Sequence, residues 1–123
     1  MSEIHKYSGD QDKFQWEGVE GLPVNEEGLR YVTKHILIGE DEGAPNYIMR
    51  FFHLEPGGHS KLEHHPQEHE VIILNGMGEV QIAETTYSVK PFDVVFIEGN
   101  ELHQFRALED HDLGFICVIP NIL

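Results

Sequence analysis

Short runs of strand-forming residues, separated by turn residues at nearly regular intervals, constrain the fold of this chain more than any other feature. The separating segments include Asn75-Gly76-Met77-Gly78, Lys90-Pro91 and Gly99-Asn100, which favour turns over continued strands. No convincing amphipathic helix is present. About eight short strands with this punctuation predict an all-β sandwich or barrel. The runs that predict strands are 31–38, 47–54, 70–74, 79–83, 86–89, 94–97, 102–107 and 113–119.

The chain divides into an irregular beginning and a strand-rich remainder. Residues 1–28 carry the aromatic residues Phe14 and Trp16 among charged positions, and their glycines and Pro23 argue against a long helix. A chain of 123 residues has room for a single hydrophobic core. We therefore expect 1–28 to form an N-terminal segment that packs on the barrel, and 29–123 to form one β-barrel domain.

Charge and composition exclude several classes of partner. With 22 acidic against 8 basic residues, the formal net charge is −14, and such a surface repels nucleic-acid phosphates. No apolar run approaches the roughly 20 residues that span a bilayer, and residues 1–10 lack the apolar stretch of a secretory signal. Cys117 is the only cysteine, so an intrachain disulfide is excluded. We expect a cytoplasmic protein with neither nucleic-acid nor membrane partners.

Histidine and glutamate residues gather in one stretch of the chain. Glu63-His64-His65 and Glu68-His69-Glu70 stand close together, and His103 follows on a distant predicted strand. The chain holds nine histidines in total. Neutral imidazole nitrogens and carboxylates suit Mn, Fe, Co, Ni, Cu and Zn. On spacing alone, a metal site competes with a solvated loop that happens to be rich in these residues.

Strand periodicity sorts these residues into two faces. Side chains two positions apart on a strand point to the same side, so His65 and His69 share a face with Val71, whereas His64 falls on the other face. Pro66 interrupts the stretch, so the parity is suggestive there. Glu63 belongs to the same set as His65, and His103 shares its parity with an aromatic, Phe105. If this set points inward, four ligand-capable groups face the interior.

Two stretches of the chain resemble the two conserved motifs of the cupin family. The first family motif reads G-x5-H-x-H-x3/4-E-x6-G, and residues 56–76 follow it with His65, His69 and the closing Gly76. Residues 93–106 resemble the second motif, G-x5-P-x-G-x2-H-x3-N, and contain His103. The flanking segments 44–50 and 115–120 resemble those of small bacterial and archaeal manganese-type cupins. The resemblance implies a single-domain jelly-roll barrel, the double-stranded β-helix of cupins.

The resemblance also implies a ligand set, with one rearrangement. Counted back from Gly76, His69 occupies the position where many cupins have a glutamate ligand, and Glu63 occupies that of the first histidine. The implied metal ligands are therefore Glu63, His65, His69 and His103. A rival register places His64 in the ligand role instead of Glu63, and strand parity favours Glu63.

The function implied by the resemblance is that of a metalloenzyme acting on a small organic molecule. We expect one divalent transition metal per chain, Mn or Fe first and Zn, Ni, Co or Cu as alternatives. A metal-dependent oxidoreductase, with dioxygenase-type oxidation or C–C cleavage, is favoured over a metal-dependent isomerase, cyclase or decarboxylase. The alternative of a different class is a non-catalytic barrel that binds or senses a small molecule. Glu63 is the candidate catalytic residue, as a ligand that dissociates and acts as a base.

Three further expectations concern the cavity and the assembly. Phe115, Cys117 and Ile119 alternate along one strand and are expected to line the cavity. Arg50 lies in a hydrophobic strand and is expected to point outward. N-terminal strands of similar cupins often cross to a neighbouring barrel, so we expect a homodimer in which residues 1–28 pack on their own barrel or on the partner.

Overall fold

Antiparallel strands make up most of the molecule. The computed structural model describes residues 2–10 and 13–121. This part of the chain contains nine strands and one short 3-10 turn, η1 (Glu40–Glu42). The strands are β1 (Gly21–Pro23), β2 (Arg30–Ile38), β3 (Tyr47–His59), β4 (His69–Gly76), β5 (Gly78–Ile82), β6 (Thr85–Val89), β7 (Val94–Ile97), β8 (His103–Ala107) and β9 (Leu113–Pro120). The all-β prediction is confirmed.

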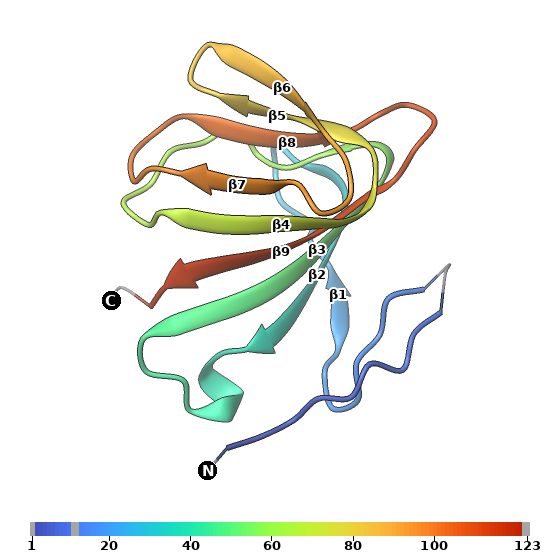
Figure 1. Ribbon diagram of the computed structural model, residues 1–123, viewed down its shortest axis with the longest axis vertical. Helices are drawn as coiled ribbons and strands as arrows, with labels where there is room; N and C mark the ends of the chain where they lie inside the picture. Colours follow the sequence, from blue (N-terminus) through green and yellow to red (C-terminus); the bar gives the residue numbers. More distant parts are fainter. Residues whose placement is uncertain (1, 11–12, 122–123) are drawn as a thin grey trace.

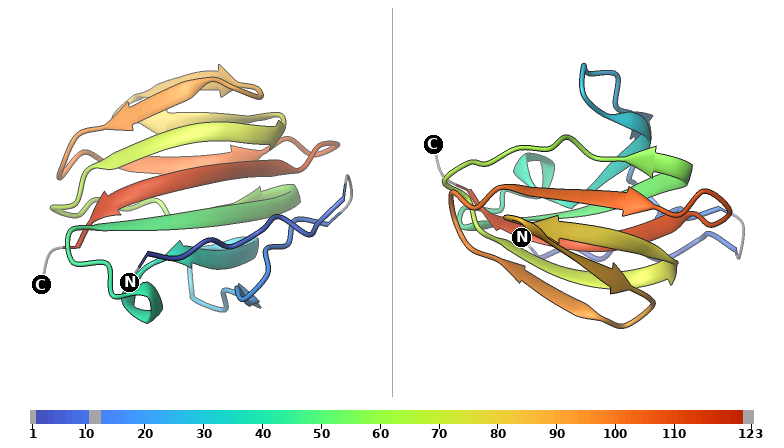
Figure 2. Two further views of the ribbon diagram at one scale, coloured as in Figure 1. Left: turned by 60° about the horizontal axis from the view of Figure 1, so that its bottom comes forward. Right: turned by 90° about the horizontal axis from the view of Figure 1, so that it is seen from above.

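The strands form one curled sheet. Its order is β6-β5-β8-β3-β9-β4-β7, and β2 joins β1 to β3 on a side branch. Figure 1 shows the strands stacked with β6, β5 and β8 at the top and β3 and β2 below, and Figure 2 shows how the sheet curls round on itself. All the strand pairs in the described part of the chain are antiparallel. This is the jelly-roll barrel that the sequence predicts.

Period-two alternation places the core and the histidines on the same inner face. On β4, His69 is buried together with Val71 and Ile73, while Glu70 between them is exposed. On β8, His103 is buried and so is Phe105 two residues later. Each histidine is the first residue of its strand, so it extends the inner face beyond the apolar core.

The N-terminal segment packs on the outside of β2 and β3. Phe14 stacks on Phe51 with ring centroids 4.7 Å apart, and Trp16 contacts Phe51 and His35 at 5.2 and 5.7 Å. Both views in Figure 2 show this blue segment alongside those strands. Because strand neighbours face opposite sides, Phe51 contacts the segment while Phe52 faces the interior. The boundary at residue 28 and the homodimer remain predictions.

Two local expectations from the sequence are wrong. The strand predicted over 47–54 is longer than expected, because β3 continues through Pro56-Gly57-Gly58 to His59. The β2–β3 register shifts at this point, and Gly57 adopts the left-handed region at φ +76°, which glycine tolerates. The Gly57 N–H donates to the carbonyl of Leu108, and pairing with β2 and β8 resumes at His59. The short strand β1, which contains a glycine and a proline, was not predicted.

No helix among the described residues is both long and apolar enough to cross a membrane.

Candidate metal centre

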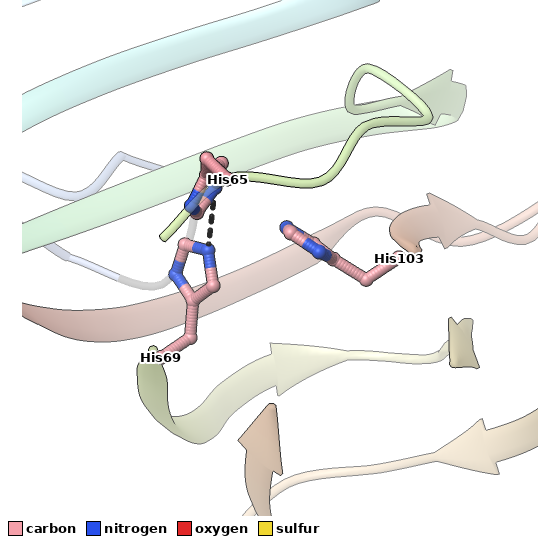
Figure 3. Close-up of side chains that lie close together, drawn as sticks. All are labelled: His65, His69 and His103. Carbon is pink, nitrogen blue, oxygen red and sulfur yellow. Dashed lines mark hydrogen bonds between the residues drawn. The ribbon is translucent and has the colours of Figure 1, made fainter. Parts of the chain in front are cut away.

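Three histidines from separate parts of the chain meet inside the barrel. His69 begins β4, His103 begins β8, and His65 lies in the segment between β3 and β4. Each offers a ring nitrogen, and these nitrogens lie within 4.8 Å of one another. The ring centroids are 4.7 to 5.1 Å apart, and Figure 3 shows the rings pointing toward a common region. Such convergence is the geometry expected of metal ligands.

The far sides of two rings are held by hydrogen-bond partners. His103 Nδ1 lies 2.9 Å from the carbonyl oxygen of Glu101, to which it can only donate. His69 Nδ1 lies 2.9 Å from Sγ of Cys117. In the tautomers with the proton on Nδ1, both rings turn an Nε2 lone pair toward the cluster. A partner on the far ring nitrogen is the usual arrangement around a metal-binding histidine.

Burial keeps two of these rings uncharged. The pKa of His69 is lowered to about 3, first by burial and then by the positive charges of His103, Arg50 and His65. Burial also lowers the pKa of His103, and the hydrogen bond to the Glu101 carbonyl opposes the shift only in part. Neutral imidazole is the form that binds a metal, so these two side chains are ready to coordinate at neutral pH.

His65 and His69 make the closest contact in the cluster. Their Nε2 atoms are 3.0 Å apart, and Nδ1 of His65 is buried with no hydrogen-bond partner among the described residues. Without a cation, one Nε2 must carry a proton and donate to the other, because two lone pairs at this distance repel. A divalent cation removes that requirement and accepts both lone pairs. The donor set of this cluster therefore fits a transition metal.

Glu63 and His64 lie on different sides of the loop that precedes β4. Glu63 pairs with His103 through two backbone hydrogen bonds of 3.1 and 2.9 Å, and its Oε1 is 3.8 Å from Nε2 of His65. Glu63 lines the histidine cavity, whereas His64 is exposed and does not. The tight group of ligand atoms contains the three histidines without Glu63, so Glu63 as the fourth ligand remains a prediction.

The histidines line a cavity of about 220 Å³. Phe52, Phe105 and Phe115 form much of its apolar wall, and Cys117 lines it too, as expected. Ile119 packs against the core without lining it. The other lining residues are Val24, Glu26, Leu29, Val32, Lys34, Arg50, Leu54, Ser60 and Lys61.

Arg50 points into this cavity, so the outward orientation expected from the sequence is wrong. Its Nη2 donates to Sγ of Cys117 at 3.2 Å, and its guanidinium lies over the ring of Phe52 at 4.9 Å. The sequence held a signal for this orientation, because Arg50 shares its strand parity with Phe52 and Leu54. Parity alone does not place Lys34, because both faces of its strand carry apolar residues, and Lys61 lies outside the predicted strands.

A second group of ligand-capable side chains lies away from this cavity. Glu3, His5 and Glu42 bring their ligand atoms within 4.8 Å of one another. His5 lies 2.9 Å from the Glu42 carboxylate and 2.8 Å from the carbonyl oxygen of Glu17. The hydrogen bond to Glu42 is the largest cause that raises the pKa of His5. An ion pair between the N-terminal segment and η1 accounts for this group.

Residues 50–119 match the family model of the cupin domain. This chain belongs to the cupin family. It is 40% identical over 112 residues to the 1-methylthio-D-xylulose 5-phosphate methylsulfurylase of Rhodospirillum rubrum, covering 89% of this chain and 70% of that enzyme. Among solved structures, it is similar to a cupin-2 domain protein of Rhodospirillum rubrum, with a TM-score of 0.83 and 37% identity over 94% of this chain and 78% of that one. It is also similar to a cupin 2 conserved barrel domain protein of Rhodopseudomonas palustris, with a TM-score of 0.85 and 30% identity over 98% of this chain and 81% of that one.

The lowered pKa of His69 predicts how the metal-free protein responds to acid. Between the ordinary pKa of 6.5 in the unfolded chain and the folded value of about 3, the unfolded state binds a proton that the folded state excludes. The free energy of unfolding should therefore fall as the pH drops through this range. Urea denaturation of EDTA-treated protein at several pH values measures the slope.

The variant His69→Gln should show a shallower pH dependence of the free energy of unfolding than the wild type. Equal slopes for wild type and His69→Gln would contradict the assignment of this titration to the buried ring.

Proposed function

We propose that this cupin is a metal-dependent enzyme that acts on a small phosphorylated organic molecule, and that His65, His69 and His103 hold its metal ion. The observation that carries the proposal is the convergence of three ring nitrogens in an interior cavity. Burial holds two of these rings neutral, which favours coordination over ion pairing. Mn or Fe remains our first choice, with Zn, Ni, Co and Cu as alternatives, because this donor set suits each of them.

The bound ion would polarise an oxygen atom of the substrate, and the protein residues would position and protect the reacting groups. Three ligands from the protein leave coordination positions for Glu63, for substrate or for water. Glu63 is suited to a double role, because its side chain is 43% exposed and lies beside His65. As a ligand that dissociates, it could accept a proton from the substrate.

The relationship to the Rhodospirillum rubrum enzyme suggests the substrate. That enzyme is named for 1-methylthio-D-xylulose 5-phosphate, and we propose a methylthio-substituted ketose phosphate as the substrate of this chain. The cavity supports a compound of this kind. Its three phenylalanines offer an apolar wall to a thioether group, since sulfur packs favourably against aromatic rings. Its volume of about 220 Å³ restricts it to small molecules.

The fourth ligand can be assigned by comparing two variants. Glu63→Gln should weaken metal binding about tenfold or more, since losing a ligating or supporting carboxylate typically costs that much. His64→Gln should leave metal binding unchanged, because His64 is exposed outside the cavity. Competition titration against a chelator of known affinity measures both. Weaker binding in His64→Gln alone would establish the rival register.

The reaction can be tested directly with the substrate of the relative. Metal-loaded protein is incubated with 1-methylthio-D-xylulose 5-phosphate and a dithiol reductant, with and without oxygen, and mass spectrometry follows the substrate. We expect loss of the methylthio group in both atmospheres, with the dithiol supplying the two electrons and two protons for cleavage of the C–S bond and becoming a disulfide as methanethiol leaves. The reaction should be at least about 100-fold slower in His103→Ala, because loss of a metal ligand impairs metal-dependent catalysis. Lys90→Gln, a surface variant at an exposed ion pair with Asp93, serves as the control.

Other outcomes of this assay would replace the proposal. Consumption only with oxygen, accompanied by oxygen uptake, would support the dioxygenase-type oxidation favoured by the sequence. Conversion without loss of the methylthio group would support an isomerase, cyclase or decarboxylase. Tight binding without any conversion would support the non-catalytic binding barrel.

A further inference from the structure

The histidine cavity concentrates positive charge in a strongly acidic protein. The chain has only 8 lysine and arginine residues and a formal net charge of −14. Three of those basic residues line this one cavity, namely Lys34, Arg50 and Lys61. Among the described residues, two carboxylates, Glu26 and Glu63, line it with them. The cavity is therefore cationic even before a metal ion is counted, and it would attract anions that the rest of the surface repels.

Two of these cations lack a carboxylate partner within the described residues. Lys61 pairs with Glu26 at 3.2 Å, but neither Lys34 nor Arg50 forms an ion pair there. Nε of Arg50 is buried and has no hydrogen-bond partner in the part of the chain that the structure describes. Burial and the nearby charge of Arg50 lower the pKa of Lys34. Like charges in a partly buried site are unfavourable, and an anion between them would relieve this cost.

The fold brings these groups to the same cavity from neighbouring elements. Lys34 lies opposite Phe52 and Ile36 lies opposite Arg50 in the β2–β3 ladder, so Lys34 and Arg50 are diagonal neighbours on one face. Lys61 belongs to the segment after β3 that also carries Glu63 and His65. The same short segment thus connects the basic residues to the candidate metal centre.

We propose that Lys34, Arg50 and Lys61 form an anion subsite beside the three histidines and bind the phosphate monoester of the substrate. This inference rests on the proposed function and assigns residues to the charged end of its substrate. A phosphate dianion would accept hydrogen bonds from the two ammonium groups and from the free Nε–H of Arg50. With the phosphate fixed there, only ketoses of suitable length would place their reactive carbons at the metal.

Two ketoses that differ only in the phosphate test this subsite. Isothermal titration calorimetry of the metal-loaded protein measures the affinity for D-xylulose 5-phosphate and for D-xylulose. We expect the wild type to prefer the phosphorylated ketose at least about tenfold, and this preference should weaken with rising salt because it is electrostatic. The double variant Lys34→Gln/Lys61→Gln should lose most of the preference.

Controls separate the subsite from the metal and from the fold. Lys90→Gln removes an exposed lysine of equal charge and should keep the preference. The metal content and thermal denaturation of the double variant show whether its metal centre and its fold are intact. If the double variant does not fold, the single variants Lys34→Gln and Lys61→Gln take its place. Arg50 is left unchanged, because its contact with Cys117 links it to His69.

Equal affinity of the wild type for the two ketoses would overturn the inference, and so would an unchanged preference in a folded lysine variant. Failure of the proposed reaction is a separate result. It would appear as no consumption of the methylthio substrate by a wild type that still prefers the phosphorylated ketose.

Discussion

The convergence of three imidazole rings, two of them buried, at one point of the barrel interior is the constraint on which the rest of this structure depends. Buried polar groups need partners, and here the carbonyl of Glu101 and the sulfur of Cys117 hold the outer nitrogens of His103 and His69. The inner nitrogens of all three rings remain directed at one another. A cation satisfies them together, which no arrangement of protons among the three rings does as simply.

Two of the basic residues beside these histidines, Lys34 and Arg50, also lack a carboxylate partner within the described residues, and an anionic substrate would supply the missing charge. Arg50 contacts Cys117, which in turn contacts His69, so Arg50 connects the basic residues of the cavity to the candidate metal centre. A net charge of −14 over the whole chain makes the cationic cavity a local exception. Positive groups held near one another without acidic partners cost stability, and such costs are characteristic of binding sites. An anionic substrate is the simplest occupant that makes this arrangement favourable.

The sequence predicts the fold and part of the site for clear physical reasons. Alternation on β4 predicts the inward position of His69 beside Val71, because strand parity holds within a regular strand. The same alternation does not predict the position of His65, because Pro66 interrupts the stretch and a loop positions the ring. The position of Lys34 could not be predicted either, because it depends on the pairing of β2 with β3 across the cavity. The inward orientation of Arg50 was predictable from its parity with Phe52. The hydrophobic residues around Arg50 in that strand obscured this signal.

The most direct test of the central claim is anomalous diffraction from crystals of the protein loaded with Mn. The account predicts one strong peak per chain within bonding distance, roughly 2 Å, of Nε2 of His65, His69 and His103. A peak confined to the outer group of Glu3, His5 and Glu42, or no peak in the barrel cavity, would contradict it.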